Sequence, residues 1–316
     1  MNLSIIIPLL NEEESLEELF FRINTVCTTA NLSYEVWFID DGSTDLSWSI
    51  IENLKVQYPQ IHGIKFSRNY GKSQALHAAF ERAKGDVVIT MDADLQDFPE
   101  EIPELNRMIV QENYDIVSGW KKKRYDNVMT KNIPSKLFNA AARKVSGVEL
   151  HDFNCGLKAY KKEVVKSIDV YGDMHRYIPV LAANAGFRRI TEKEVPHQAR
   201  PYGTSKFGTE RFVRGFLDLV TLWFVSRFGG RPMHLFGAVG TVMFIVGFLS
   251  TVWLGVSKLI NVARGIYGHL ITDNPWFFIA LTMMLMGTLL FIAGFLGEML
   301  IRTNREQKNY NIDKMI

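Results

Sequence analysis

Two long runs without a formal charge in the last third of the chain limit what it can fold into. They extend over residues 235–257 and 275–297 and contain 23 residues each. At about 1.5 Å per residue, a helix of this length spans roughly 35 Å, enough to cross a hydrocarbon core of about 30 Å. A buried hairpin in a soluble core is the alternative, but both runs exceed the usual length of core helices. We therefore predict two transmembrane helices, over 233–258 and 274–299.

Basic residues flank these two runs unequally. Those outside the pair are Arg227, Arg231, Arg302, Arg305 and Lys308, whereas the stretch between the runs offers only Lys258 and Arg264. Lys and Arg are enriched on the cytoplasmic side of membrane proteins, so both ends of the pair are expected in the cytosol. The pattern predicts an inner-membrane protein with two spans, a short non-cytosolic loop over 259–273 and a cytosolic tail over 300–316.

The segment just before the first run has a mixed character. Residues 207–232 combine aromatic and aliphatic side chains with Arg211, Arg214 and Arg227. Such a composition suits amphipathic helices that lie in the membrane interface. Ordinary packing helices at the edge of a domain are the alternative, and the sequence leaves it open.

Length, charge and cysteine content narrow the function classes. A chain of 316 residues exceeds the usual size of one domain, and its net charge of +2 gives no support for binding nucleic acid. Cys27 and Cys155 lie far apart and outside any CxxC spacing, so neither a zinc site nor a disulfide framework is indicated. Both are expected to be reduced thiols.

Residues 1–206 alternate between short apolar runs and stretches with helical periodicity. The expected strands are 3–8, 34–39, 61–66, 87–91 and 114–118, with helices between them. This alternation predicts an α/β domain with a doubly wound, mostly parallel sheet. Ligands of such sheets bind at the carboxyl ends of the strands, so the loops after Pro8, Ile39, Phe66 and Met91 are the candidate site.

Acidic residues are concentrated in these loops. Asp92 and Asp94 follow the fourth strand directly, and Asp40 and Asp41 follow the second. Carboxylate oxygens in this arrangement suit Mg²⁺ or Mn²⁺, which also takes oxygens from a diphosphate. No glycine-rich phosphate loop is present in the sequence. Asp40 or Asp41 can accept a hydrogen bond from the imino group of uracil or guanine, although a helix-capping turn is the simpler alternative for Asp41–Asp45.

Four motifs in order resemble those of family 2 glycosyltransferases with a GT-A fold. They are IIIPLLNE at 5–12, DDGSTD at 40–45, SRNYGK at 67–72 and DADLQD at 92–97. RPYGTSK at 200–206 is similar to the family's RxxGxSK segment. Together with two C-terminal spans, the series most resembles the polyprenyl-phosphate branch, which includes bactoprenol glucosyltransferases and dolichol-phosphate mannosyltransferases.

The resemblance implies roles for individual residues. The donor nucleotide would contact Pro8, Leu10, Glu12, Asp40, Asp41, Asn69, Lys72 and Asp92, and the metal would contact Asp92, Asp94 and Gln96. Asp94, Asp152, Arg200 and Lys206 would be the catalytic residues, with the two cations meeting the donor diphosphate. The acceptor phosphate would contact Lys121, Lys131 and Ser135.

The implied function is an inverting, metal-dependent transfer of a hexose from a nucleotide sugar to polyprenyl phosphate at the cytosolic membrane face. The product would serve cell-envelope glycan modification. A phosphate monoester is already an oxyanion at neutral pH, so no general base is strictly required. UDP-glucose is the favoured donor by resemblance, and a mannosyltransferase that uses GDP-mannose is an alternative. A non-catalytic membrane scaffold that binds nucleotide sugar is a further alternative, and assembly as a homo-oligomer stays open.

Overall fold

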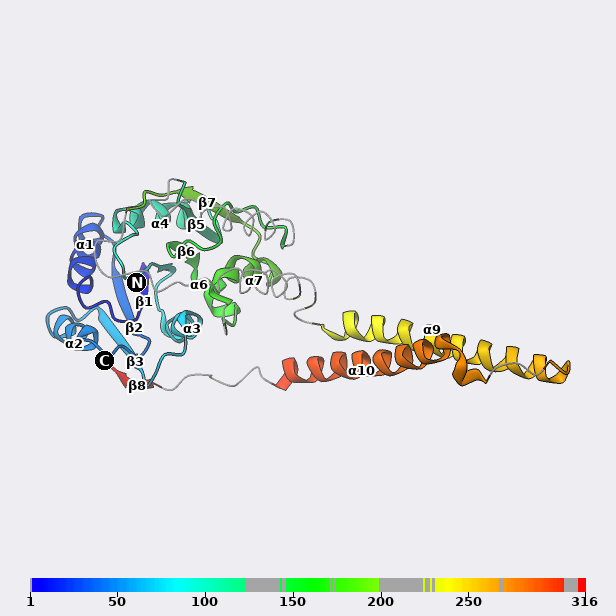
Figure 1. Ribbon diagram of the computed structural model, residues 1–316. Coiled ribbons are helices and arrows are strands. Elements are labelled where there is room, and N and C mark those ends of the chain that lie inside the picture. The colour runs from blue at the N-terminus through cyan, green and yellow to red at the C-terminus, as the bar shows by residue number, and fades with distance from the viewer. Residues whose placement is uncertain are drawn as a thin grey trace. The chain divides into compact units, whose positions relative to one another are not determined.

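The computed structural model describes residues 2–122, 143, 146–170, 172, 174–198, 224, 228, 231–266, 270–303 and 312–316. The chain divides into two compact units, one of residues 1–226 with 309–316 and the other of residues 227–308. The first unit contains the mixed sheet and its helices, and the second contains two long helices (Figure 1).

The first unit is built on strands and helices that alternate as the sequence predicts. Its strands are β1 (Leu3–Leu9), β2 (Tyr34–Asp40), β3 (Ile61–Phe66), β4 (Val87–Thr90), β5 (Ile116–Trp120), β6 (Lys158–Lys161), β7 (Ile190–Glu194) and β8 (Ile312–Met315). Its helices are α1 (Leu16–Thr29), α2 (Ser47–Gln57), α3 (Lys72–Arg82), α4 (Ile102–Val110), α6 (Lys162–Ser167) and α7 (Ile178–Asn184).

The described strands form one sheet in the order β7-β5-β6-β4-β1-β2-β3-β8. The four strands β4, β1, β2 and β3 are parallel to their neighbours in that group. Their carboxyl ends therefore meet at one edge of the sheet, which confirms the predicted α/β fold and places the acidic loops together. β5 and β7 are also parallel to each other, and β5 is antiparallel to β6.

The central strands are apolar because both faces of the sheet are covered. Ile5, Ile6 and Ile7 of β1 are all fully buried, although neighbouring residues of a strand point to opposite faces. Ile6 belongs to one core cluster and Ile5 and Ile7 to another. Two cores of this kind explain why β1 has a continuous apolar sequence rather than an alternating one.

Three strands of the observed sheet are absent from the predicted series: β7, which is parallel to β5, and the short antiparallel strands β6 and β8. β6 lies between β4 and β5, so the fourth and fifth strands of the predicted series are not neighbours. β8 pairs with β3, and the main chains of Gly63 and Ile316 exchange hydrogen bonds of 3.2 and 3.1 Å. The segment after the second long helix thus contributes an edge strand to the sheet of the first unit.

The second unit contains the helices α9 (Met233–Ala263) and α10 (Pro275–Thr303), which lie side by side (Figure 1). Their apolar parts have mean hydropathies of 2.1 and 2.3, and both are long enough to cross a membrane. Two apolar helices at this position fit a membrane protein with two spans. The first helix extends to Ala263, past the predicted end at 258, while most of 207–232 lies outside the described residues.

Glycines bring α9 and α10 into direct backbone contact. A Cβ added to Gly240 would lie 2.5 Å from the carbonyl oxygen of Gly287, and one added to Gly287 would lie 2.6 Å from that of Gly240. A Cβ added to Gly247 would likewise lie 2.6 Å from the carbonyl oxygen of Ala280. Helices in lipid gain little from hydrophobic burial against each other, so close packing at small residues is a main source of their association.

Candidate active site

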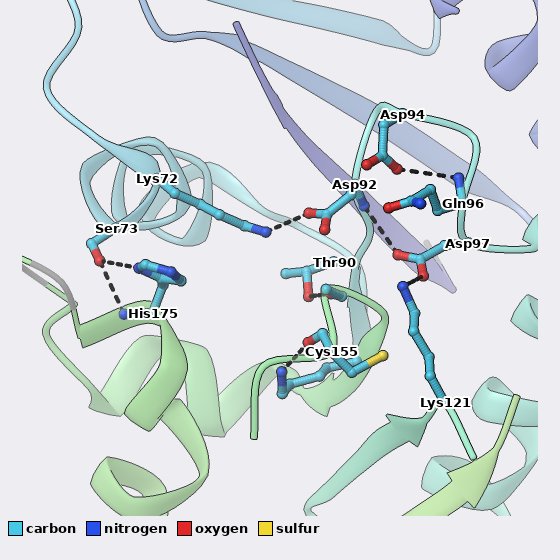
Figure 2. A network of polar contacts seen from close by, with 12 residues as sticks. Lys72, Ser73, Thr90, Asp92, Asp94, Gln96, Asp97, Lys121, Cys155 and His175 are labelled. Atoms are coloured by element: carbon cyan, nitrogen blue, oxygen red, sulfur yellow. Dashed lines mark hydrogen bonds and ion pairs between the residues drawn. The ribbon is translucent and has the colours of Figure 1, made fainter. Parts of the chain in front are cut away.

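The loop after β4, residues 92–97, is named the carboxylate loop here and forms the centre of the site (Figure 2). Asp94 is buried and its Oδ1 accepts a hydrogen bond of 3.1 Å from the main-chain N–H of Gln96. Asp97 Oδ2 accepts one of 3.3 Å from the main-chain N–H of Asp92. Between them Leu95 has a φ of +58° and a fully buried side chain. The loop is therefore a tight turn held by its own carboxylates.

Asp92 is bound by the first residue of α3. Lys72 Nζ donates a short hydrogen bond to Asp92 Oδ1 and forms an ion pair with it (Figure 2). Burial disfavours the charge on Asp92, but Lys72 and Lys121 outweigh it and lower the pKa of Asp92 to about 2. The partner effect is mutual: burial opposes the charge on Lys72, yet Asp92 raises its pKa overall. Asp92 is consequently an ionised carboxylate at neutral pH.

Gly156 leaves room for this carboxylate. A Cβ at Gly156 would lie 2.4 Å from Asp92 Oδ2, so any larger residue would displace Asp92. The carbonyl of Gly156 is fixed by Thr90 Oγ1, which donates to it at 2.9 Å (Figure 2). The backbone at Gly156 thus forms one wall beside the carboxylate loop.

Lys121 supports the loop from the end of β5. Its Nζ lies 2.7 Å from Asp97 Oδ1, and the side chains of Lys121 and Asp97 are only 10% and 0% exposed. Burial opposes the charge on Lys121, but Asp97 raises its pKa overall. The ion pair joins the ends of β4 and β5 across the intervening strand β6. A residue predicted to contact the acceptor phosphate therefore contacts the carboxylate loop in the described structure.

Gln198 contacts the same loop from the segment that follows β7. Its side-chain Nε2 donates a short hydrogen bond to the carbonyl of Leu95. In return, Gln96 Nε2 donates to the main-chain carbonyl of Gln198 at 3.4 Å. Val195, three residues earlier, hydrogen-bonds the carbonyl of Trp120 at 3.0 Å and so extends the β5–β7 pairing. The carboxylate loop is thereby held by three separate segments of the chain.

The loops after β1, β2 and β3 form the other half of the site. Asp41 accepts hydrogen bonds from the main-chain N–H groups of Tyr70 and Gly71, at 2.7 and 2.9 Å, and so fixes the SRNYGK loop. Burial raises the pKa of Asp41, and these two N–H groups oppose that shift. Asp40 Oδ1 accepts from the N–H of Ser43 at 2.7 Å, whereas its buried Oδ2 has no hydrogen-bond partner among the described residues.

The remaining predicted donor residues lie on the same loops. Pro8 and Leu10 are half-buried at the end of β1, and the N–H of Glu12 donates to Ser47 Oγ at 3.0 Å. Asn69 is exposed, and its main chain lies against Gly42, where an added Cβ would be 2.8 Å from the Asn69 nitrogen. The loops after β2 and β3 are therefore in contact through the glycine of the DDGSTD motif.

Asp152 lies in the buried segment before β6. It is 2% exposed, and its Oδ1 accepts from the N–H of Asn154 at 3.1 Å. Lys158 Nζ donates to the carbonyls of Phe153, at 3.2 Å, and Cys155. Burial lowers the pKa of Lys158, with Cys155 and Asp152 opposing that shift. Lys158 thus fixes the backbone of the segment that carries Asp152.

The donor set is compatible with a divalent cation that shares its coordination with a ligand. Within the residues that the structure describes, no group of three or more His, Cys, Asp and Glu side chains could hold a metal by themselves. Asp92, Asp94 and Gln96 supply two carboxylates and one amide on a single loop. Mg²⁺ and Mn²⁺ accept such oxygen ligands and complete their coordination with phosphate oxygens or water.

Four predicted site residues, Lys131, Ser135, Arg200 and Lys206, lie outside the described residues. In contrast, three contacts were missed by sequence reasoning, namely those of Asp97, Gly156 and Gln198. Asp97 closes the DADLQD motif, so its position was a usable signal. Gly156 lies 64 residues after its partner Asp92, and Gln198 lies 103 residues after its partner Leu95. No local sequence pattern connects residues so far apart.

Comparison with known proteins identifies the family. Residues 4–169 match the profile of glycosyl transferase family 2. The chain is a family 2 glycosyltransferase. It is 33% identical over 309 residues to a dodecaprenyl-phosphate galacturonate synthase of Rhizobium johnstonii, covering 96% of this chain and 88% of that one. It is 36% identical over 296 residues to an undecaprenyl-phosphate 4-deoxy-4-formamido-L-arabinose transferase of Aeromonas hydrophila, covering 93% and 87%.

Solved structures support the GT-A fold of this glycosyltransferase. Glucosyl-3-phosphoglycerate synthase from Mycobacterium tuberculosis, in complex with Mn²⁺, UDP and glucosyl-3-phosphoglycerate, matches with a TM-score of 0.54 and 17% identity. The match covers 71% of this chain and 79% of that one. At this identity the likeness concerns the fold, and it confirms the predicted GT-A architecture.

Proposed function

We propose that this glycosyltransferase transfers a sugar from a nucleotide sugar to a polyprenyl phosphate at the cytosolic face of the inner membrane. The names of its full-length relatives support a polyprenyl-phosphate acceptor. Two apolar helices that can cross a membrane suit an enzyme whose acceptor is a lipid. The observation that carries the catalytic part is the carboxylate loop, in which ionised Asp92 and buried Asp94 lie at the carboxyl ends of the parallel strands.

Asp92, Asp94 and Gln96 would hold Mg²⁺ or Mn²⁺ together with the donor diphosphate. The cation would stabilise the negative charge that develops on the leaving nucleoside diphosphate. Arg200 and Lys206 would contact the same phosphates, because charge-assisted hydrogen bonds from Arg and Lys suit this anion. Lys72 keeps Asp92 ionised, so its substitution is expected to impair this site as well.

Asp40 is the better candidate for the base contact. Both oxygens of Asp41 accept hydrogen bonds from the loop after β3, whereas Asp40 Oδ2 has no partner among the described residues. An unpaired buried acceptor is costly unless a ligand donates to it. The imino group of uracil or guanine is such a donor. We therefore expect Asp40→Asn to weaken UDP binding more selectively than Asp41→Asn, which would also release the SRNYGK loop.

The acceptor phosphate would approach from the side of β5. Lys131 and Ser135 are proposed to contact it, and a phosphate oxyanion attacks the anomeric carbon directly, with inversion. Lys121 is a weaker candidate for this contact than the family resemblance implies, since its ammonium group is paired with Asp97. Asp152 would orient the sugar, because its buried carboxylate lies four residues before Gly156, whose backbone lies against Asp92.

The chain connectivity supports the proposed membrane orientation. The first unit precedes α9, and β8, which follows α10, belongs to the same sheet. Both ends of the helix pair are attached to the same folded unit, so both must lie on the same side of a bilayer. A segment that crosses a bilayer twice meets this requirement, because it returns to the side from which it started. Together with the arginines outside the pair of helices, this favours a cytosolic catalytic unit.

The donor is proposed to be a UDP sugar. The resemblance to bactoprenol glucosyltransferases favours UDP-glucose, whereas the names of the full-length relatives favour a galacturonate or a 4-deoxy-4-formamido-L-arabinose donor. Uracil and guanine both offer an imino N–H to Asp40, so GDP-mannose belongs in the test.

The decisive experiment measures sugar transfer from a panel of nucleotide sugars to undecaprenyl phosphate by the detergent-purified chain. The panel contains the UDP sugars named above and GDP-mannose, each with Mg²⁺, with Mn²⁺ and with EDTA. Asp94→Asn is the test variant, and Asp86→Asn, an exposed aspartate before β4, is the matched control. We expect labelled lipid that depends on the metal and on Asp94, with a loss of at least about 100-fold in the variant.

Two outcomes would contradict the proposal. Nucleotide-sugar binding without transfer to any lipid phosphate would favour the scaffold alternative. Transfer that persists at the wild-type rate in Asp94→Asn or in EDTA would rule out the proposed metal loop.

A further inference from the structure

We propose that Gln198 is a positioning residue that holds the carboxylate loop in the conformation that binds the metal and the diphosphate. The inference rests on the proposed metal-dependent function, which it deepens by assigning the residue that fixes the loop. Gln198 belongs to none of the motifs by which the family resemblance was established. It lies 103 residues after Leu95, its partner in the carboxylate loop.

The contact consists of two hydrogen bonds that run in opposite directions. The side-chain amide of Gln198 donates to the carbonyl of Leu95, and the side-chain amide of Gln96 donates to the main-chain carbonyl of Gln198 at 3.4 Å. Leu95 and Gln96 directly follow Asp94. The pair of bonds therefore fixes the backbone immediately beside a proposed metal ligand, and it orients the amide of a second one.

The backbone at Leu95 explains why the loop needs an external partner. Its φ of +58° lies in the left-handed region, which is unfavourable for a residue with a branched side chain. The fully buried side chain anchors the residue, but the carbonyl also needs a donor, because buried carbonyls are rarely left unpaired. Gln198 supplies that donor. Without it, the turn between Asp94 and Gln96 loses one of the contacts that keep it in a strained conformation.

The origin of Gln198 in the fold makes it a firm support. It follows β7, whose pairing with β5 continues to the hydrogen bond between Val195 and Trp120. Only two residues separate Val195 from Gln198, so the amide is presented from the end of a paired strand. Arg200, a proposed diphosphate-binding residue, follows two residues later in the sequence.

The test uses the full-length chain in detergent and compares Gln198→Leu with Gln198→Glu. Leu removes the donor and keeps the approximate size, and Glu keeps the shape but presents a carboxylate to the Leu95 carbonyl. Gln57→Leu, at an exposed position of α2, is the control for the chemical change. Calorimetric titration with UDP, with and without Mn²⁺, measures ligand binding. Thermal unfolding and hydrogen exchange of the peptide 92–98 measure stability and loop order.

We expect both Gln198 variants to bind UDP about five- to tenfold more weakly in the presence of Mn²⁺. A loss of this size corresponds to the net free energy of one or two hydrogen bonds. UDP binding without metal and the unfolding temperature should change little, while exchange of the peptide 92–98 without ligand should become faster. Wild-type affinity in both variants would overturn the inference, as would a loss of affinity that is equal with and without Mn²⁺. If the unsubstituted chain bound UDP without any dependence on metal, the proposed function would fail first, and this inference with it.

Discussion

The carboxylate loop and the α9–α10 pair both depend on close backbone approach, but different forces stabilise them. The loop is fixed by charged and amide side chains that come from three distant segments, namely Lys72, Lys121 and Gln198. The helix pair is fixed by glycines that let two carbonyl-lined surfaces touch. Polar bonds can be exchanged for bonds to water or to a ligand, whereas backbone packing in lipid has no such substitute. A site that must admit a charged ligand is accordingly built from the first kind of contact.

The largest expected effect is on the free energy of unfolding, and it comes from breaking the buried ion pair between Lys121 and Asp97. Asp97→Asn leaves the Lys121 ammonium buried without its counter-charge, which typically costs about 3–5 kcal/mol of unfolding free energy. Removing both charges in Asp97→Asn with Lys121→Met should recover much of that loss. Denaturant unfolding of the detergent-solubilised chain measures both. If the single and double variants were destabilised equally, the loss of the ion pair would not be the cause of the destabilisation.

The next effect concerns the wall beside Asp92. Gly156→Ala places a Cβ where Asp92 Oδ2 now lies, so the carboxylate has to move. A displacement of about 1 Å at a catalytic group costs on the order of 100-fold in rate, and we expect that loss in the transfer assay. Gly147→Ala is the matched control, because a Cβ there would meet nothing within 4 Å, although its φ of +70° adds some strain. If the Gly156→Ala variant kept its transfer activity, the position of Asp92 would not matter for the reaction.

The corresponding test in the helix pair replaces Gly240 with Leu. The new side chain overlaps the backbone of α10 near Gly287, and overpacking of this kind costs typically about 1–3 kcal/mol. Gly255→Leu, on the same helix, is the control, since a Cβ there meets nothing within 4 Å. Hydrogen exchange of α9 peptides in detergent should increase only for Gly240→Leu. If both variants behave alike, glycine packing does not hold the pair together.

The most gradual effect is a dependence of stability on pH at the start of α3. Ser73 Oγ accepts from the N–H of His175 at 3.0 Å and lies 3.1 Å from its Nδ1 (Figure 2). Burial, with Lys72 in a smaller role, lowers the pKa of His175 to about 3. Because the unfolded chain binds a proton below about pH 6.5 and the folded chain does not, stability is lost as pH falls from 6.5 towards 3.

The loss amounts to at most about 1.4 kcal/mol per pH unit for a single group. His175→Asn keeps a hydrogen-bond acceptor near Ser73 and does not titrate, so its unfolding temperature should fall less steeply between pH 6.5 and 4. An unchanged slope would show that other groups control the acid sensitivity. Ser73→Ala, which keeps the imidazole, should retain the slope of the original chain.

The sequence predicted the parts of the fold that have periodic patterns. The strands and helices from Leu3 to Trp120 have apolar runs and helical spacing, and the predicted elements match the observed ones within a few residues. β6 was missed because its four residues, KAYK, carry too few apolar positions to form a pattern. β8 was missed for the same reason, since its sequence IDKM was interpreted as part of a polar tail.

The candidate site was predictable in its location but not in its internal contacts. The motifs placed the acidic residues at one edge of the sheet because parallel strands share that edge. Which carboxylate pairs with which cation depends on side chains that come from distant segments. Lys121 illustrates the limit, since the family resemblance implied a phosphate contact whereas its ammonium group meets Asp97.

β8 has a consequence for how the enzyme can be divided. The strand completes the sheet beside β3, yet it follows α10 in the chain. In terms of chain order, the two apolar helices are therefore an insertion within the sheet domain rather than an appendix to it. A fragment that stops before α9 would leave the β3 edge without its neighbour, and exposed edges of this kind promote aggregation. A water-soluble version of the catalytic unit would have to join the end of the first part to residues 309–316 through a linker that replaces the helices.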